Sequence, residues 1–166
     1  MPEMIDIYDS HRNRTGRICE RGTPMGEDEF RLVVYAWLLN PKNEVLLTRR
    51  HPSKAWGGYW ECTAGHVQAG ESSLDGALRE LQEEVGVTVD RRDGALIKKE
   101  KDGSVFIDFW LFHSDVSAES LVLQPEEVTD AKWTGRSEYE TMCREGLLVP
   151  SCLEFTGWNE EKRKNG

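Results

Sequence analysis

The sequence predicts the α/β (α+β) class: a mixed β-sheet with helices against it, arranged as an α+β fold or as an α/β/α sandwich. Three observations predict it. Residues 32–39 are an almost unbroken apolar run, as in a strand buried on both faces. Residues 72–86 have the period and the end signals of an amphipathic helix. Asp102-Gly103 favours a hairpin turn between two further apolar segments.

The N-terminal segments are expected to form a hairpin. Residues 4–9 alternate in polarity, and turn-forming residues separate them from a second strand at 15–19. The buried strand at 32–39 then ends at an Asn-Pro turn, and residues 45–48 return beside it. Residues 52–70, which are rich in glycine and aromatic residues, are expected to form a loop.

The helix at 72–86 is the clearest element. Ser72 is a suitable N-cap, and Gly86 suits the left-handed position that ends a helix. At about 100° per residue, four apolar residues fall in one arc that faces the core. They are Leu74, Leu78, Leu81 and Val85. Further strands are expected at 95–99, 105–113 and 127–133, and further helices at 138–145 and 151–162.

The length of 166 residues is about that of one domain, and a core of this size needs neither a disulfide nor a metal. We expect a single domain, a monomer or homodimer, made of an N-terminal hairpin (1–28), a core (29–135) and a C-terminal helical segment (136–166). No apolar run approaches the roughly 20 residues of a membrane span, so no membrane partner is expected.

The charge balance limits the partners. Lys and Arg number 21 against 30 Asp and Glu, which gives a formal net charge of −9 at pH 7. Proteins that bind the backbone of duplex nucleic acid need a basic face, so this partner is not expected. An acidic protein that handles a phosphate compound needs local positive charge, from a divalent cation or a small Arg/Lys cluster.

The cysteines and the N-terminus predict the compartment. Four cysteines stand far apart, without the spacing of a zinc or redox site, and are expected to be reduced thiols. Met1 leads directly into Pro2-Glu3, without the basic and apolar regions of a secretory signal. We therefore expect a cytoplasmic protein.

Three carboxylates gather on another face of the helix at 72–86: Glu80, Glu83 and Glu84. Each pair of like charges at this spacing costs roughly a few tenths of a kcal/mol in an isolated helix, so a compensating cation is expected. Mg²⁺ prefers oxygen ligands and commonly binds one or two carboxylates together with substrate phosphates. Taken alone, the cluster also suits a solvated acidic face.

The residues around the cluster favour the metal. They read Gly65-(five residues)-Glu71-(seven residues)-Arg79-Glu80-Leu81-Gln82-Glu83-Glu84-Val85-Gly86-Val87. This stretch matches the signature of the Nudix hydrolases at every specified position, and the chain resembles that family from about Arg31 to Trp133. The resemblance implies the α/β/α sandwich of that family and cleavage of a diphosphate linked to another group.

The resemblance also implies a metal site and a catalytic set. Glu80, Glu83 and Glu84 are expected to bind Mg²⁺ or Mn²⁺, with the backbone carbonyl of Gly65 as a further ligand. The metal would neutralise the phosphoryl oxygens and orient the attacking water. Arg79 belongs to the same set.

Three residues of the signature are expected to support this site. Arg79 should hold the carboxylates as a bidentate partner rather than bind the metal. Glu71 should pair with Arg79 or bind metal through water, and Gly86 should end the helix.

The general base varies within the family. Here Glu83 or Glu84 suits the role, as do Glu126 and Glu127 in a later loop, although these two also suit an ordinary exposed pair.

The substrate contacts are expected just before the signature. Arg49, Arg50 and Lys54 form a compact basic group that suits a terminal phosphate, or equally a solvated strand end. Trp56 and Tyr59 follow in the glycine-rich loop. Their rings suit stacking on a base or covering an isoprenoid tail, or closing the edge of the core.

Two alternatives remain beside a Mg²⁺-dependent hydrolase of a nucleoside diphosphate derivative or related small diphosphate. Residues 49–66 also resemble type I isopentenyl-diphosphate isomerase, but the isomerase has a cysteine where this chain has Ala64, and its metal-binding histidine corresponds to Arg31. It also lacks the complete R-E-x-x-E-E that is intact here. A non-catalytic ligand-binding or regulatory module of the same fold would be expected to lose the glutamates that this chain keeps.

Overall fold

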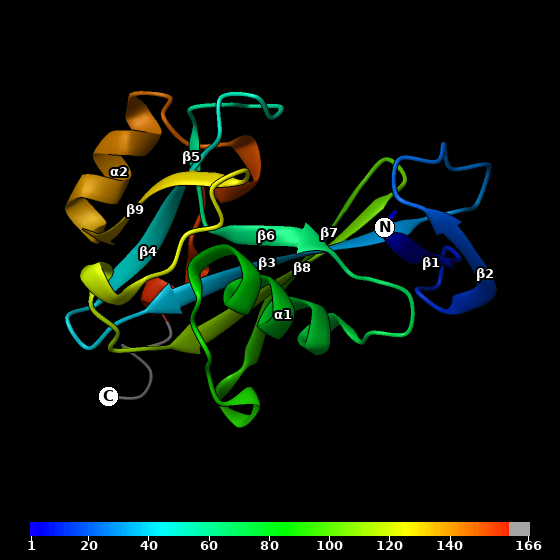
Figure 1. Cartoon of the computed structure of the whole chain (residues 1–166), viewed down its shortest axis with the longest axis horizontal. Helices are drawn as coiled ribbons and strands as arrows, with labels where there is room; N and C mark the ends of the chain where they lie inside the picture. The colour runs from blue at the N-terminus through cyan, green and yellow to red at the C-terminus, as the bar shows by residue number, and fades with distance from the viewer. Residues whose placement is uncertain (160–166) are drawn as a thin grey trace.

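The computed structural model describes residues 1–159, and a seven-stranded mixed sheet forms its centre (Figure 1). The strands are β3 (Arg31–Leu39), β4 (Glu44–Arg50), β5 (Trp60–Glu61), β6 (Thr63–His66), β7 (Ala95–Asp102), β8 (Val105–His113) and β9 (Val128–Gly135). The order is β5-β4-β3-β8-β7, with β6 paired to β3 and β9 paired to β4. β3 and β8 run parallel, whereas the other pairs are antiparallel.

Strands β3 and β4 meet at one register pair, Leu39↔Val45, and then diverge. β6 enters the fork between them and pairs along β3, from Val33↔His66 to Ala36↔Thr63. β9 pairs along the whole of β4. The expected loop at 52–70 is therefore wrong in part, since it contains β5 and β6. These strands are too short to show a period in the sequence. They form because the backbone groups of β3 and β4 that do not pair with each other need hydrogen-bond partners.

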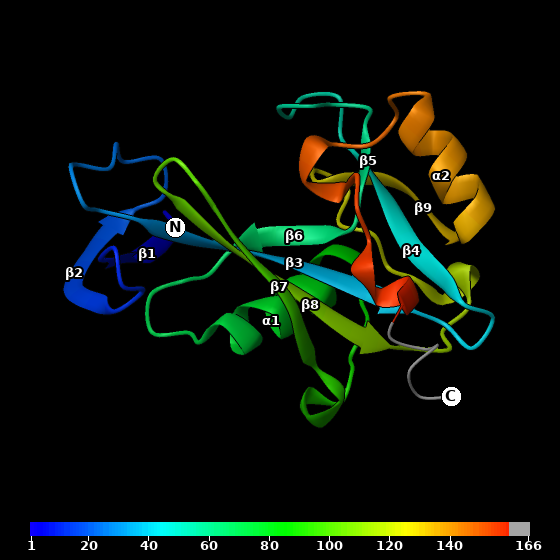
Figure 2. The ribbon, with the colours of Figure 1, turned by 180° about the vertical axis from the view of Figure 1, so that it is seen from behind.

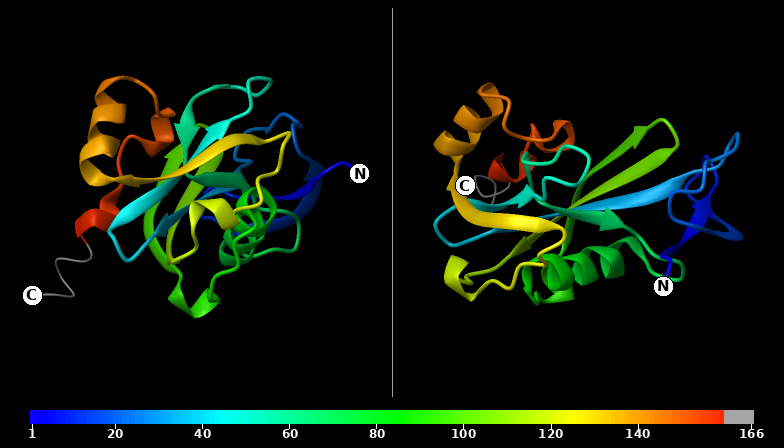
Figure 3. Two further views of the ribbon diagram at one scale, coloured as in Figure 1. Left: turned by 60° about the vertical axis from the view of Figure 1, so that its left-hand side comes forward. Right: turned by 45° about the horizontal axis from the view of Figure 1, so that its top comes forward.

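The two faces of the sheet carry separate apolar cores, because successive residues of a strand point to opposite faces. The helix α1 (Ser73–Val85) covers one face, and the helix α2 (Arg136–Arg144) with the C-terminal turns covers the other (Figure 3). From β3, Val34 and Leu38 face α1, whereas Trp37 and Leu39 face the α2 side. The predicted sandwich of a mixed sheet between helices is confirmed.

The helix α1 begins and ends as expected. The Ser72 hydroxyl accepts the Asp75 N–H at 3.1 Å while the Asp75 carboxylate accepts the Ser72 N–H, which forms a capping box. Gly86 ends the helix in the left-handed region at φ 70°. Leu81 is fully buried, which stabilises the fold by about 1.5–3 kcal/mol. Glu80 and Glu84 are also buried, so the covered face is wider than the apolar arc predicts.

The N-terminal hairpin forms as predicted, from β1 (Met4–Tyr8) and β2 (Arg14–Glu20). It lies at one end of the molecule beside the loop that enters α1 (Figure 2). The Met4 carbonyl accepts the Ala69 N–H at 2.8 Å, and the Asp6 carboxylate accepts the Gly70 N–H at 2.8 Å. The hairpin is thus attached to the segment between Gly65 and Glu71.

The C-terminal segment differs from the expectation. Residues 138–145 fall largely within α2, but the helix expected at 151–162 is wrong. Two single 3₁₀ turns, Pro150–Cys152 and Thr156–Asn159, replace it, and residues 160–162 lie outside the described part of the chain. Phe155 and Trp158 both bury their rings on the α2 side of the sheet, and this burial outweighs the local helix propensity.

Among residues 1–159, no helix combines the length and the apolar composition needed to cross a membrane.

Candidate active site

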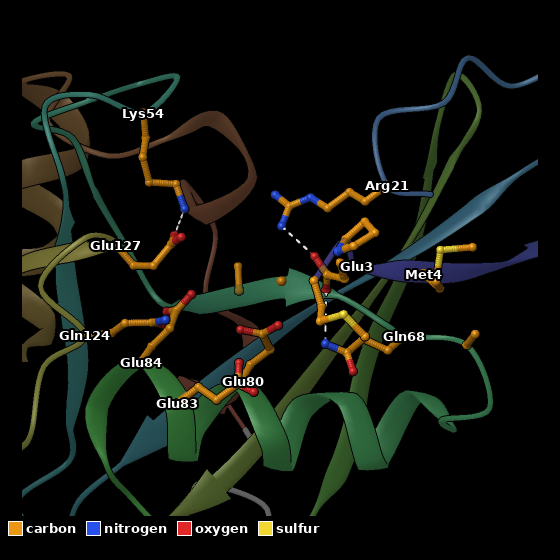
Figure 4. A pocket seen from close by; sticks show the side chains of 15 residues that line it. Glu3, Met4, Arg21, Lys54, Gln68, Glu80, Glu83, Glu84, Gln124 and Glu127 are labelled. Carbon is orange, nitrogen blue, oxygen red and sulfur yellow. Dashed lines mark hydrogen bonds and ion pairs between the residues drawn. The ribbon is translucent and has the colours of Figure 1, made fainter. Parts of the chain in front are cut away.

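A cavity of about 490 Å³ opens over the carboxylate face of α1 (Figure 4). Its floor consists of α1 side chains and the backbone of β6. One wall comes from the loops before β5 and β9, and the other comes from the N-terminal hairpin. The described lining residues are Met1, Pro2, Glu3, Met4, Arg21, Lys54, Ala64, Gly65, Gln68, Ala69, Glu80, Glu83, Glu84, Gln124 and Glu127. Five carboxylates and two side-chain cations therefore face this space.

Glu80 lies directly beneath β6. A Cβ atom added to Gly65 would lie less than 3.0 Å from the Glu80 carboxylate, so a larger residue there would force the carboxylate or the strand to move. Burial raises the pKa of Glu80 to about 7, although the charge of Arg79 opposes this shift. The carboxylate and the Gly65 backbone thus form a close pair of oxygen-bearing groups.

Glu84 is the most deeply buried of the three carboxylates, with 5% of the residue exposed. Burial raises its pKa well above the usual value, and the charges of Glu80 and Glu61 add to the effect. Its Oε2 atom is buried and has no hydrogen-bond partner among the described residues. An unsatisfied carboxylate oxygen of this kind is unfavourable, and a bound cation would compensate for it.

Glu83 differs from its two neighbours because 47% of its side chain is exposed. It lines the cavity from the solvent side and accepts a hydrogen bond from Arg79 Nη1 at 3.1 Å. The three carboxylates of the signature therefore reach the same cavity at different depths.

Arg79 connects the carboxylates to the segment before α1. Its Nε and Nη2 atoms donate to the two oxygens of Glu71 at 2.8 and 3.0 Å, a bidentate pair. Nη1 donates to Glu80 at 2.9 Å as well as to Glu83, and Nη2 also donates to the His66 carbonyl at 2.9 Å. One guanidinium thus fixes the positions of three carboxylates and of β6.

The donor set fits a hard divalent cation in its chemistry. It offers carboxylate oxygens, a close backbone and the unpartnered Oε2 atom of Glu84, and Mg²⁺ prefers oxygen ligands. Within residues 1–159, no three His, Cys, Asp or Glu side chains already converge on one point in the way that holds a metal ion. Arg79 accounts for this, since its guanidinium binds Glu80 and Glu83.

The basic group expected to bind phosphate is divided by the fold. Lys54 lines the cavity and forms an ion pair with Glu127, and burial lowers the pKa of this lysine. Arg49 instead donates to the Gly58 carbonyl at 3.0 Å. Arg50 donates to Glu61 at 2.7 Å and does not line the cavity.

The remaining predicted residues are similarly divided. Trp56 is 52% exposed and its ring packs edge-on against Tyr59, with 5.1 Å between the centroids; neither ring lines the cavity. Glu127 lines the cavity, whereas Glu126 lies outside it, with its carboxylate 3.4 Å from Gln124 Nε2.

Several cavity residues carry no signal in the sequence. Glu3 and Arg21 lie in the hairpin and are more than 40 residues from the nearest glutamate of α1, and only the fold brings them to the cavity. Gln68 and Gln124 are ordinary loop residues by their sequence context. Glu61 is buried near the cavity, and its place after a tryptophan in β5 gives no indication in the sequence that it is buried.

The sequence and the fold agree with one family. A NUDIX domain model matches residues 29–147, and the chain belongs to the Nudix hydrolase family. An uncharacterized Nudix hydrolase of Listeria monocytogenes is 32% identical over 150 residues, which cover 89% of this chain and 89% of the relative. Such similarity over most of both chains supports a hydrolase.

The chain is also similar to an isomerase and to a solved structure. The isopentenyl-diphosphate Delta-isomerase of Escherichia coli is 36% identical over 89 residues, which cover 52% of this chain and 49% of the isomerase. A crystal structure from Deinococcus radiodurans superposes with a TM-score of 0.71 at 20% identity, covering 89% of this chain and 92% of that one. The latter likeness shows the fold alone.

Proposed function

We propose that this protein hydrolyses, with Mg²⁺ or Mn²⁺, the diphosphate linkage of a nucleoside diphosphate derivative or a related small diphosphate. One observation carries the proposal. Buried Glu80 lies against the bare backbone of Gly65 at the floor of an open cavity, and buried Glu84 lines the same cavity with one oxygen that has no partner among the described residues. When bound, the cation would neutralise phosphoryl charge and activate water.

The residues in and beside the cavity would have different roles according to their positions. Glu80 and Glu84, with the Gly65 carbonyl, would hold the cation at the floor, and Glu83 would complete the site at its open side. Arg79 would fix the rotamers of Glu80 and Glu83 through its bidentate anchor on Glu71. Lys54 is the predicted phosphate ligand that lines the cavity.

Glu127 is the stronger candidate for the general base. It lines the cavity opposite α1, whereas Glu126 lies outside it. Its ion pair with Lys54 holds the carboxylate at the wall, and a phosphate group that attracted Lys54 would release the carboxylate to accept a proton from water. Glu83 and Glu84 then act on the metal rather than on the proton.

The two alternatives lack a supporting feature. An isomerase of the related type uses a cysteine at the position of Ala64, and the described cavity lining contains no cysteine. A non-catalytic module has no use for Glu84, a buried carboxylate whose Oε2 atom has no partner among the described residues. We expect the reaction in the cytoplasm, where the four free thiols would stay reduced.

The test is release of phosphate or pyrophosphate from a panel of nucleotide sugars, dinucleotides, nucleoside diphosphates, nucleoside triphosphates and prenyl diphosphates. We expect turnover with Mg²⁺, none with chelator, and a loss of about 100-fold or more in Glu84→Gln. Glu126→Gln, which removes an equal charge outside the cavity, is the matched control and should retain activity within about twofold.

Activity that persists in chelator, or a Glu84→Gln protein as active as the wild type, would refute the proposal. Conversion of isopentenyl to dimethylallyl diphosphate without hydrolysis would assign the protein to the isomerases instead.

A further inference from the structure

The N-terminal hairpin forms a wall of the cavity although it lies outside the matched family domain, which begins at residue 29. Its attachment is specific. Met4 and Asp6 bind the backbone of Ala69 and Gly70, and Arg14 donates to the Glu71 carbonyl. The hairpin is therefore held to the same segment that positions Arg79, and its side chains keep a fixed relation to the carboxylates.

Arg21 is the hairpin residue whose side chain brings positive charge to the described cavity lining. It projects from the wall opposite Lys54, with the α1 carboxylates between the two cations (Figure 4). Burial is the main cause of the lowered pKa of both Lys54 and His66, and the charge of Arg21 adds to each shift. Its positive field therefore reaches across the cavity rather than only into solvent.

The present partner of Arg21 is a carboxylate that also faces the cavity. Nη1 donates to Glu3 at 3.0 Å, and Glu3 accepts a second hydrogen bond from Gln68 Nε2 at 3.4 Å. The Nε and Nη2 atoms of Arg21 have no partner within residues 1–159, and 48% of its side chain is exposed. The guanidinium is thus oriented by one anion and has donors left for another.

We propose that Arg21 binds a second anionic group of the substrate, beyond the diphosphate held at the carboxylates, so that the preferred substrates end in a free phosphate. The inference rests on the proposed function. A phosphate chain that runs from Lys54 across the metal site would point toward the opposite wall, where the fork of Arg21 suits a phosphate in bidentate geometry. A diphosphate that is esterified at both ends offers a neutral group there instead, and leaves Arg21 paired with Glu3.

The experiment compares binding of inorganic tripolyphosphate and pyrophosphate by isothermal titration calorimetry, with Ca²⁺ in place of Mg²⁺ to slow turnover. In Arg21→Ala we expect tripolyphosphate to bind about tenfold more weakly, as for a partly exposed charge-assisted contact, and pyrophosphate to change by less than about twofold. Arg17→Ala is the matched control, because Arg17 lies in the same hairpin and pairs with Glu29 away from the cavity.

Glu3→Gln adds a test whose expected result would not be seen if the role of Arg21 were merely structural. Removing the competing carboxylate should tighten tripolyphosphate binding severalfold in the wild-type background and leave it unchanged in the Arg21→Ala background. Equal effects of Glu3→Gln in both backgrounds, or equal losses of both phosphates in Arg21→Ala, would overturn the inference.

The two proposals fail in different ways. A protein that binds tripolyphosphate through Arg21 but cleaves no member of the substrate panel refutes the hydrolytic function alone. A protein that cleaves doubly esterified diphosphates best, with kcat/KM independent of Arg21, refutes the role of Arg21 and leaves the hydrolase.

Discussion

Gly65 and Glu80 lie so close together that even a methyl group on Gly65 would overlap the Glu80 carboxylate. The contact joins β6 to the middle of α1 and allows the backbone to approach a buried carboxylate. A substitution that adds a Cβ atom to Gly65 tests the contact directly, because this atom must displace either β6 or Glu80.

We expect Gly65→Ala to lower activity by about 100-fold and to destabilise the protein by roughly 1–3 kcal/mol, the cost of overpacking. The measurements are kcat/KM and urea unfolding. Gly135→Ala is the control, since that residue has φ −72° and its added Cβ would meet no atom within 4 Å. A Gly65→Ala protein with wild-type activity would mean that the close approach serves no purpose in the site.

Glu127→Gln tests the general base. Loss of a positioned proton acceptor costs about 10²–10⁴-fold in rate, and we expect the loss in kcat rather than in KM. Glu126→Gln changes the neighbouring carboxylate outside the cavity and should stay within about twofold of the wild type. If the two variants lose activity equally, the base belongs to α1 instead.

Arg79→Lys keeps the charge but removes the fork that binds Glu71, Glu80 and Glu83 together. We expect a loss of about 10–100-fold in activity and weaker Mg²⁺ binding, measured by titration of activity against metal concentration. Arg91→Lys, in an exposed ion pair with Asp75, is a control for the general effect of such a change. Unchanged metal dependence in Arg79→Lys would contradict a positioning role.

Arg50→Met tests whether Arg50 has a structural role through Glu61 rather than the expected role in substrate binding. It leaves Glu61 buried without its partner, and burial already raises the pKa of Glu61. A carboxyl group whose folded pKa is raised favours folding at low pH and loses that contribution as the pH rises through the folded pKa. We therefore expect Arg50→Met to cost about 3–5 kcal/mol at pH 8 and less at pH 5.

Urea unfolding at the two pH values measures this effect, and Arg49→Met, which loses one exposed hydrogen bond to the Gly58 carbonyl, should change little at either. A pH-independent loss in Arg50→Met, or weaker phosphate binding without any loss of stability, would return Arg50 to the substrate site.

The helix α1 could be predicted because its determinants are local. Ser72 and Gly86 mark its ends, and the spacing of Glu80, Glu83 and Glu84 follows from the helical period. The burial of Glu80 and Glu84 was not predictable, because it depends on β6, a four-residue strand that forms only when β3 and β4 diverge. Local pattern thus predicted the element but not its depth in the protein.

The unpredicted part of the site depends on contacts between distant residues. Arg50 and Lys54 look alike in the sequence, yet a buried Glu61 binds the first and the cavity receives the second. Arg21 had no sequence signal at all, since the docking of the hairpin on Ala69 and Gly70 decides its position. Such assignments need the tertiary structure because the deciding partner is remote in the chain.

The fork between β3 and β4 separates the floor of the cavity from one of its walls. Glu80 and Glu84 stand on α1 over β6, which is bonded to β3, whereas Lys54 and Glu127 adjoin β4 and β9. The floor of the cavity and the wall made by the loops before β5 and β9 therefore belong to two ladders that share the single register pair Leu39↔Val45. Substitutions near that junction, remote from the glutamates, can alter substrate size preference by changing the angle at which the two ladders separate.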